Sequence, residues 1–402
     1  MNRSFLNARL VCPIAGVRQG DLHVADDRIV ADAPADAQVI DCNGRILAPA
    51  ITDIGVFAMD KAACRAGGIV RIGLMPDQSP VLDDPGIVQR AAAMGKPELW
   101  VHPLAAATHA LDGANLSEFA INAEAGARAV ATGRGWIADS GVMRRVLAYA
   151  RDCGLTVISH AEDVGLTGRA VATDGETATR LGLPSAPAMA EALAVARDLM
   201  LAEETGAAIH FRQVTTARAF DLIRDAKARG VRVTCGVSPA HLLLSDINVT
   251  DFRTFARLSP PLRNETDRQA TLAALADGTV DLLCSSHDPR GPEEKRLPFA
   301  DATPGMAGAA SLLALGLGLV RDERITLDRL FALLARNPAQ LLGIDAGALT
   351  PGMPADLVLI DPEAPWQISA DTMAGKAGNT PFDGLPVQGK AVRLFKGGAE
   401  IA

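Results

Sequence analysis

The spacing of apolar and polar residues along the chain changes near residue 50. Residues 4–48 alternate between the two kinds in short runs broken by Gly, Asp and Asn, which predicts short β-strands joined by tight turns. Beyond residue 50, short and nearly continuous apolar runs alternate with amphipathic segments, several of which end in Gly, the usual helix stop. The predicted strands among these runs cover residues 69–75, 99–105, 155–161, 207–214, 231–238 and 280–286.

Repeated strand–helix units with buried strands predict a parallel sheet with helices outside it. Six to eight such units over about 290 residues favour an α/β fold of the (β/α)8 barrel type over an open sheet. The open-sheet alternative would need a phosphate-binding glycine loop, and neither GxGxxG nor GxxxxGK[ST] occurs. Strand character returns at the C-terminus, so we expect a small β-sandwich domain built from both chain ends. The predicted parts are residues 1–49 and 346–402 for that domain and 50–345 for the barrel.

Charge and composition narrow the classes of function. The net charge of −8 argues against broad binding to nucleic acid or to anionic membranes. No apolar run is long enough to predict a membrane span, and the N-terminus lacks the layout of a signal peptide. The six cysteines are scattered without a CxxC pair, as is typical of a reducing compartment. We therefore expect a cytoplasmic protein.

The residues that could carry chemistry stand at the predicted C-terminal ends of strands, where barrel enzymes place their sites. A metal-dependent amide hydrolase would need several His and carboxylate ligands there. The chain has seven histidines and no HxH, HxxxH or HExxH pair, which is sparse material for a binuclear centre. A further possibility, Cys284 as a nucleophile, has no evident base beside it. The strand-end residues are Asp53, His160, Glu162, Asp163, His210, Arg212, Gln213, His241, Ser285, Ser286, His287 and Asp288.

Long blocks of the sequence resemble the dihydroorotases of the amidohydrolase superfamily, which hydrolyse a cyclic amide in pyrimidine synthesis. The resemblance runs nearly end to end and implies a distorted (β/α)8 barrel with a composite β domain and a zinc centre. The blocks that carry it are 45–53, 74–83, 102–118, 143–150, 160–163, 202–211, 226–244, 259–263, 277–299 and 379–384.

The sequence departs from the family pattern at the positions that would hold the metal. The HxH after the first barrel strand reads Gly55 and Phe57, a later histidine ligand reads Gln213, and the catalytic aspartate reads Ser286. Only His160 among about six ligand positions keeps its ligand type. A single neutral imidazole cannot hold zinc, and a serine hydroxyl without an activating partner is a poor base.

Other departures concern substrate and charge. The family arginine that grips the substrate carboxylate aligns with Met59, and an asparagine aligns with Asp77. The final histidine of the last motif reads Arg290, and a bridging acidic residue aligns with 132–135, so that Gly133 or Arg134 stands in its place. Inward-pointing arginines would oppose a bound dication.

Three functions remain open at this point. The leading hypothesis is a catalytically silent dihydroorotase-like protein without cofactor that, by resemblance to non-catalytic members, assembles with aspartate carbamoyltransferase. The alternative is an active cyclic amidohydrolase whose atypical zinc site uses His160, His287 and Asp288, with Glu162 and Asp163 nearby. The third is a metal-free pocket that binds a small anion through Arg134, Arg263 and Arg290. A homo-oligomer is compatible with each of the three.

Overall fold

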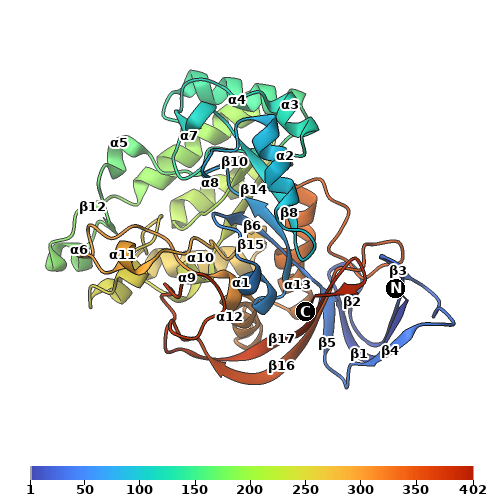
Figure 1. The fold of residues 1–402 in the computed structure, drawn as a ribbon. Coiled ribbons are helices and arrows are strands. Elements are labelled where there is room, and N and C mark those ends of the chain that lie inside the picture. Colours follow the sequence, from blue (N-terminus) through green and yellow to red (C-terminus); the bar gives the residue numbers. More distant parts are fainter. Residues whose placement is uncertain (1, 402) are drawn as a thin grey trace.

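A computed structural model describes residues 2–401 of the chain. Its centre is an eight-stranded parallel sheet with neighbour order β15-β14-β13-β10-β9-β8-β7-β6, surrounded by helices (Figure 1). The strands are β6 (Ile51–Val56), β7 (Ile69–Leu74), β8 (Trp100–Ala106), β9 (Ala129–Ala131), β10 (Val157–Ser159), β13 (Ile209–Phe211), β14 (Val233–Val237) and β15 (Leu282–Leu283).

The sheet closes between its first and last strands through hydrogen bonds beyond the strand ends. Phe57, just after β6, donates its backbone N–H to the carbonyl of His287, at 2.9 Å. The carboxylate of Asp53 accepts bonds from both the backbone N–H and the hydroxyl of Ser285. These contacts bring the residues after β6 and β15 together at one end of the barrel.

Helices cover the outside of the barrel because each presents an apolar face to the strands. The helices of the strand–helix units are α1 (Lys61–Ala66), α2 (Pro85–Ala93), α3 (Phe119–Glu124), α4 (Ser140–Asp152), α7 (Met189–Thr205), α8 (Ala217–Ala228), α10 (Glu265–Ala276), α12 (Leu312–Arg321), α13 (Leu327–Phe331) and α14 (Asn337–Leu341). Shorter elements in the loops are α5 (Val164–Thr167), α6 (Glu176–Leu181), α9 (Pro239–Leu243), α11 (Pro292–Lys295), β11 (Ala172–Thr173) and β12 (Ser185–Ala186). The predicted (β/α)8 architecture is confirmed.

Strands from both chain ends form the second sheet, as predicted. Its order is β18-β17-β16-β5-β1-β2-β3, with β4 paired to one end of β1. The strands are β1 (Arg3–Cys12), β2 (Gly16–Ala25), β3 (Arg28–Val30), β4 (Gln38–Asp41), β5 (Ile46–Pro49), β16 (Leu357–Gln367), β17 (Pro386–Lys396) and β18 (Ala399–Glu400). In Figure 1 the blue and red strands therefore lie side by side next to the barrel.

This second sheet is continuous and folds over a small core of its own. The rings of Phe5 on β1 and Phe395 on β17 meet edge to face with centroids 5.0 Å apart, although two strands separate β1 from β17 in the sheet. The other face of its strands packs on the barrel, where β17 contacts α12. None of the helices within residues 2–401 has the length and apolar character needed to cross a membrane.

Candidate functional site at the barrel mouth

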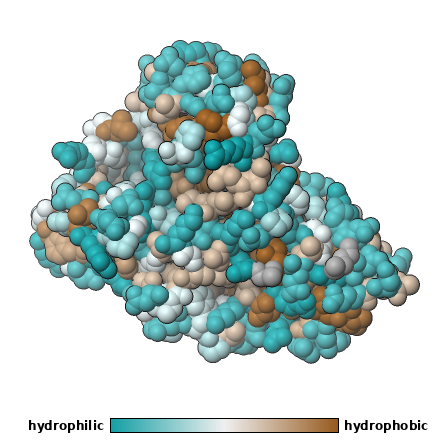
Figure 2. Space-filling model, viewed as in Figure 1, coloured by the Kyte–Doolittle hydropathy of each residue, from teal (hydrophilic) through white to brown (hydrophobic). Residues whose placement is uncertain are grey.

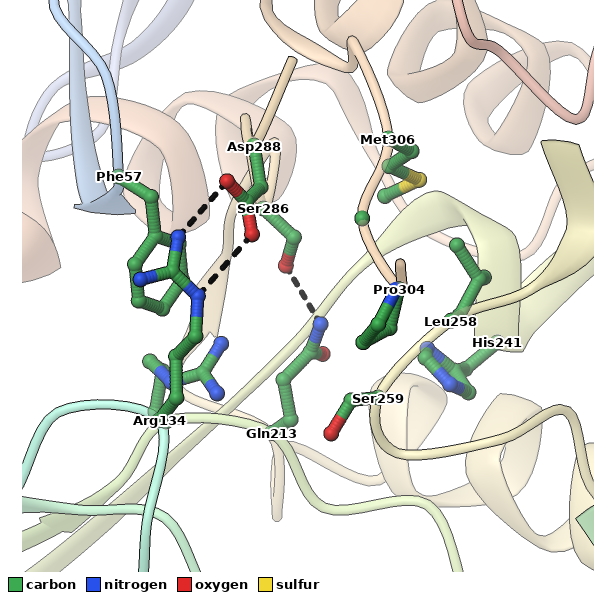
Figure 3. Close-up of a pocket in the computed structure, with 12 residues that line it drawn as sticks. Phe57, Arg134, Gln213, His241, Leu258, Ser259, Ser286, Asp288, Pro304 and Met306 are labelled. Carbon is green, nitrogen blue, oxygen red and sulfur yellow. Dashed lines mark hydrogen bonds and ion pairs between the residues drawn. The ribbon is translucent and has the colours of Figure 1, made fainter. Parts of the chain in front are cut away.

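A cavity of about 240 Å³ opens at the end of the barrel where the strands β6, β13 and β15 finish (Figure 3). We call it the barrel-mouth cavity. Polar side chains line one side of it and apolar side chains the other. The lining residues are Phe57, Arg134, Arg212, Gln213, His241, Leu258, Ser259, Ser286, Asp288, Pro304, Gly305 and Met306.

Gly55 takes part in a local irregularity of β6 and leaves room for another side chain. The pairing of β6 with β7 shifts between Ile54 and Val56, and Gly55 has φ of +86°, a conformation that favours glycine. A Cβ atom on residue 55 would lie 3.3 Å from Cδ and 3.4 Å from Cγ of Arg212. The aliphatic part of Arg212 therefore fills the space next to Gly55.

Phe57 contacts two guanidinium groups in the cavity. The Cζ atom of Arg134 lies 4.1 Å from the centre of the phenyl ring, and that of Arg212 lies 5.0 Å away. Both distances suit cation–π attraction, in which the negative face of the ring stabilises a cation. The ring and the two arginines therefore hold one another in place.

Arg212 is a buried cation that also reaches the retained His160. Its Nη2 donates to Nδ1 of His160 at 3.1 Å, so Nδ1 acts as acceptor and carries no proton. The proton of the neutral imidazole is then on Nε2, which lies 3.4 Å from Glu162. Only 4% of Arg212 is exposed, and burial lowers the pKa of its guanidinium. Arg212 thus lies between Gly55, Phe57 and His160.

Gln213 and Ser286 pair with each other in the cavity. The amide Nε2 of Gln213 donates to the hydroxyl oxygen of Ser286 at 2.5 Å, as the dashed line in Figure 3 shows. The other printed neighbour of that hydroxyl is the thiol of Cys284, 3.8 Å away. Burial raises the pKa of this thiol to about 12, so it stays protonated. Neither Ser286 nor Cys284 has a base that would activate it as a nucleophile.

The carboxylate of Asp288 accepts hydrogen bonds from two arginines. Its Oδ1 accepts a hydrogen bond of 2.8 Å from Nη2 of Arg134, and its Oδ2 accepts one of 2.9 Å from Nη2 of Arg290. Arg134 also donates its backbone N–H to Asp77 at 3.0 Å, and Arg290 bonds Glu294. These pairs neutralise the charge of Asp288 from both sides.

His287, the other retained histidine, does not face the cavity. Its Nδ1 accepts a bond from the backbone N–H of Ala309, and its Nε2 lies 3.9 Å from a carboxylate oxygen of Asp60. Burial lowers the pKa of His287 to about 4, so the ring is neutral near pH 7. His160 and His287, which the sequence names together as metal candidates, are thus directed toward different partners.

Arg263 lies in a buried ion-pair cluster beside the cavity. Its Nη2 donates to Glu162 at 2.9 Å and approaches Glu191 at 3.4 Å, while its other nitrogens bond Thr215 and Thr173. Burial alone would raise the pKa of Glu162, but its bonds to His160 and Arg263 lower it to about 2. Arg263 therefore does not join Arg134 and Arg290, the arginines grouped with it from sequence as a candidate anion site.

Comparison with known proteins shows which family the chain belongs to. Residues 52–401 match the amidohydrolase family. This chain belongs to the amidohydrolase family. Among its relatives is a protein named dihydroorotase from Citrifermentans bemidjiense, 36% identical, with 98% of this chain and 97% of the relative covered. Another, from Geotalea daltonii, also named dihydroorotase, is 39% identical, with 92% and 90% covered. The resemblance to dihydroorotases seen in the sequence is confirmed.

Solved amidohydrolase structures agree on the fold. The L-hydantoinase (dihydropyrimidinase) from Arthrobacter aurescens superposes with a TM-score of 0.87 at 23% identity, covering 100% of this chain and 96% of its own. A dihydropyrimidinase from Brevibacillus agri gives a TM-score of 0.84 at 22% identity, with coverage of 100% and 95%. At this identity the likeness establishes a shared architecture.

The residues present do not fit the zinc centre that resemblance to dihydroorotases implies. The two histidine positions after β6 hold Gly55 and Phe57. The aliphatic part of Arg212 fills the space beside Gly55, and its guanidinium lies by the ring of Phe57. A fixed positive charge there opposes a dication, because no ligand set separates the two. Within residues 2–401, no group of three or more His, Cys, Asp or Glu side chains could hold a metal ion.

Sequence reasoning located the mouth of this amidohydrolase barrel but gave Arg212 no role. The signal was present, since a charged residue within the apolar run 207–214 needs a reason to be buried. Whether that residue points into the barrel or outward depends on the local backbone, which the sequence alone does not fix.

Proposed function

We propose that this amidohydrolase-family protein is a dihydroorotase-like protein of pyrimidine synthesis that does not hydrolyse dihydroorotate and acts as a structural partner of aspartate carbamoyltransferase. The observation that carries the first part is the position of Arg212. Its aliphatic part lies next to Gly55, and its guanidinium lies by Phe57 and is bonded to His160, where the family resemblance calls for a metal. The site thus lacks the means to lower the pKa of a bound water.

A structural role is supported by the way the barrel is stabilised, which does not depend on a catalytic site. The barrel is held by its apolar core and by contacts such as Asp53 with Ser285, and none of these needs a metal. The partner comes from the resemblance to non-catalytic dihydroorotases. The face in Figure 2 is largely hydrophilic with separate apolar patches, which suits a protein that presents a folded surface to a partner.

The active alternative would need a different arrangement of the same residues. His287 would have to turn away from Asp60, and Asp288 would have to leave both Arg134 and Arg290. Breaking those two buried or half-buried ion pairs costs free energy that a single zinc ion, repelled by Arg212, would have to recover. The structure therefore favours a protein that does not hydrolyse dihydroorotate over an active enzyme.

One sample tests both parts of the proposal. The protein is co-expressed with the aspartate carbamoyltransferase of its own source, purified, and measured for zinc content and for dihydroorotase activity in both directions with added zinc, cobalt or manganese. We expect co-elution, less than about 0.1 zinc per chain, and rates that His160→Ala does not change. An active dihydroorotase is the positive control. Stoichiometric zinc, or activity that is lost in His160→Ala, would overturn the proposal that the protein is inactive. Separate elution of the two proteins would overturn the proposed partnership with aspartate carbamoyltransferase.

A further inference from the structure

Arg212 is a buried cation that forms no ion pair within the described part of the chain, and Asp77 and Asp288 favour its charge only from beyond salt-bridge distance. No Asp or Glu oxygen forms a salt bridge with it, and its hydrogen-bond partner, His160, is a neutral acceptor. Its Nε has no partner at all among residues 2–401. A guanidinium stays charged near neutral pH even when burial lowers its pKa. An uncompensated buried charge is costly, so it points to an anion that the protein itself does not supply.

The barrel-mouth cavity is where such an anion would sit. Arg212 lines this cavity, and two cationic side chains, Arg134 and Arg212, face one carboxylate, Asp288, among the lining residues. Asp288 already accepts hydrogen bonds from Arg134 and Arg290, so it favours the charge of Arg212 only from a distance and does not pair with it. The lining therefore keeps an excess positive charge at Arg212.

The remaining walls indicate what else the anion carries. Leu258, Pro304 and Met306 close the side of the cavity opposite Arg134 and Phe57 (Figure 3). His241 adds no charge, since its Nδ1 bonds Ser238, its Nε2 bonds the carbonyl of Pro260, and burial lowers its pKa to about 4. A volume of about 240 Å³ with apolar walls suits a small organic molecule better than a simple halide ion.

We propose that the barrel-mouth cavity binds a small organic carboxylate, whose carboxylate group pairs with the guanidinium of Arg212 and whose apolar body packs on Leu258, Pro304 and Met306. The site differs from the family's carboxylate position, because the arginine expected there aligns with Met59. Here a side-chain cation next to Gly55, Phe57 and His160 attracts an anion where the family resemblance places a metal. The inference goes beyond the proposed structural role and does not depend on it.

Benzoate and benzamide test this inference, because they share a ring and a shape but differ in charge. Binding to the purified full-length protein is measured by calorimetry and by thermal shift in a chloride-free HEPES buffer, with 10 mM of each probe and with 10 mM sodium chloride. We expect benzoate to bind with a dissociation constant below about 1 mM and to raise the melting temperature by about 2 °C or more. Benzamide and chloride should give no shift. Equal effects of benzoate and benzamide, or of benzoate and chloride, would overturn the proposal.

Arg212→Met assigns the binding to this side chain. Methionine keeps an aliphatic chain beside Gly55 but removes the cation, so the variant should lose the benzoate shift. Without any added anion it should be as stable as the wild type or more so, because an unpaired buried charge is gone. The matched control is Arg18→Met, which removes an exposed arginine of β2 and should bind benzoate normally. Unchanged benzoate binding in Arg212→Met would refute the assignment, and if this variant does not fold, the comparison of benzoate with benzamide still decides.

Discussion

The side chain of Arg212 and a side chain on residue 55 compete for the same space. Residue 55 is a glycine with φ of +86°, and a Cβ atom added there would lie 3.3 Å from Cδ of Arg212. A contact of this length forces the neighbour to shift by a few tenths of an ångström. A histidine at residue 55 would therefore require Arg212 to move from its observed position.

A comparison of two glycines isolates this contact. Gly55→Ala adds both backbone strain and the clash with Arg212, whereas Gly230→Ala, also at φ of +86° but with nothing within 4 Å of its Cβ position, adds strain alone. We expect Gly55→Ala to lower the free energy of unfolding by about 1–2 kcal/mol more than Gly230→Ala does, measured by urea denaturation. In an Arg212→Ala background that difference should vanish. A difference that persists there would mean that Arg212 is not the neighbour that matters.

Sequence patterns predicted the barrel because most of its strands lie within longer, nearly continuous apolar runs, such as residues 69–75 around β7 and 207–214 around β13. They missed β9, where the polar residues Arg128 and Thr132 flank Ala129–Ala131 and leave no longer apolar run. The second sheet was also predicted, since its strands alternate apolar and polar residues. That it is one continuous sheet follows from β1 pairing with β2, β4 and β5, which no local pattern encodes.

The candidate site could be predicted only as far as strand ends determine it. Gly55, Phe57, Gln213 and Ser286 stand together at the mouth or line it, since the ends of parallel strands meet there. Strand ends do not determine the direction in which a side chain points. The turn of His287 toward Asp60 depends on loop geometry after the strand, and such geometry depends on contacts between distant parts of the chain.

Restoring histidines should not restore zinc while Arg212 remains. We expect the double variant Gly55→His, Phe57→His to bind less than about 0.1 zinc per chain, because the aliphatic part of Arg212 fills the space at residue 55 and its guanidinium repels a dication. Adding Arg212→Ser frees that space and leaves His160 beside the two new imidazoles, so zinc uptake should rise severalfold. Elemental analysis after dialysis measures both samples. Stoichiometric zinc in the double variant would show that Arg212 is no barrier.

The buried ion-pair cluster should matter for stability far more than a surface pair of similar geometry. Arg263→Gln leaves Glu162 and Glu191 buried without their cation, and we expect a loss of about 3–5 kcal/mol in the free energy of unfolding. Arg144→Gln removes an exposed pair with Glu204 and should lower the free energy of unfolding far less, because water and salt screen that pair. Urea denaturation of both variants at pH 7 makes the comparison. Equal losses of the free energy of unfolding would mean that the two pairs lie in similar surroundings, which would contradict the burial of Arg263 and its partners.

The pH dependence of stability should be dominated by buried neutral histidines. Burial lowers the pKa values of His102 and His210 to about 3 and those of His241 and His287 to about 4. The unfolded chain takes up protons on these histidines near pH 6.5, before the folded chain does, so stability present at pH 7 is lost as the pH falls toward 4. Asp53 acts in the opposite direction, because burial raises its pKa to about 6 and the folded state binds that proton first.

Four histidines outweigh one aspartate, so the free energy of unfolding should fall between pH 7 and pH 5. Each histidine contributes on the order of 2 kcal/mol to that fall, and Asp53 offsets about 1 kcal/mol of it. Urea denaturation at pH 7, 6 and 5 measures the slope. His102→Gln should make the slope shallower, because one buried site no longer titrates. A stability that stays level from pH 7 to pH 5 would mean that these rings accept protons while the chain is folded, and that their burial does not hold them neutral.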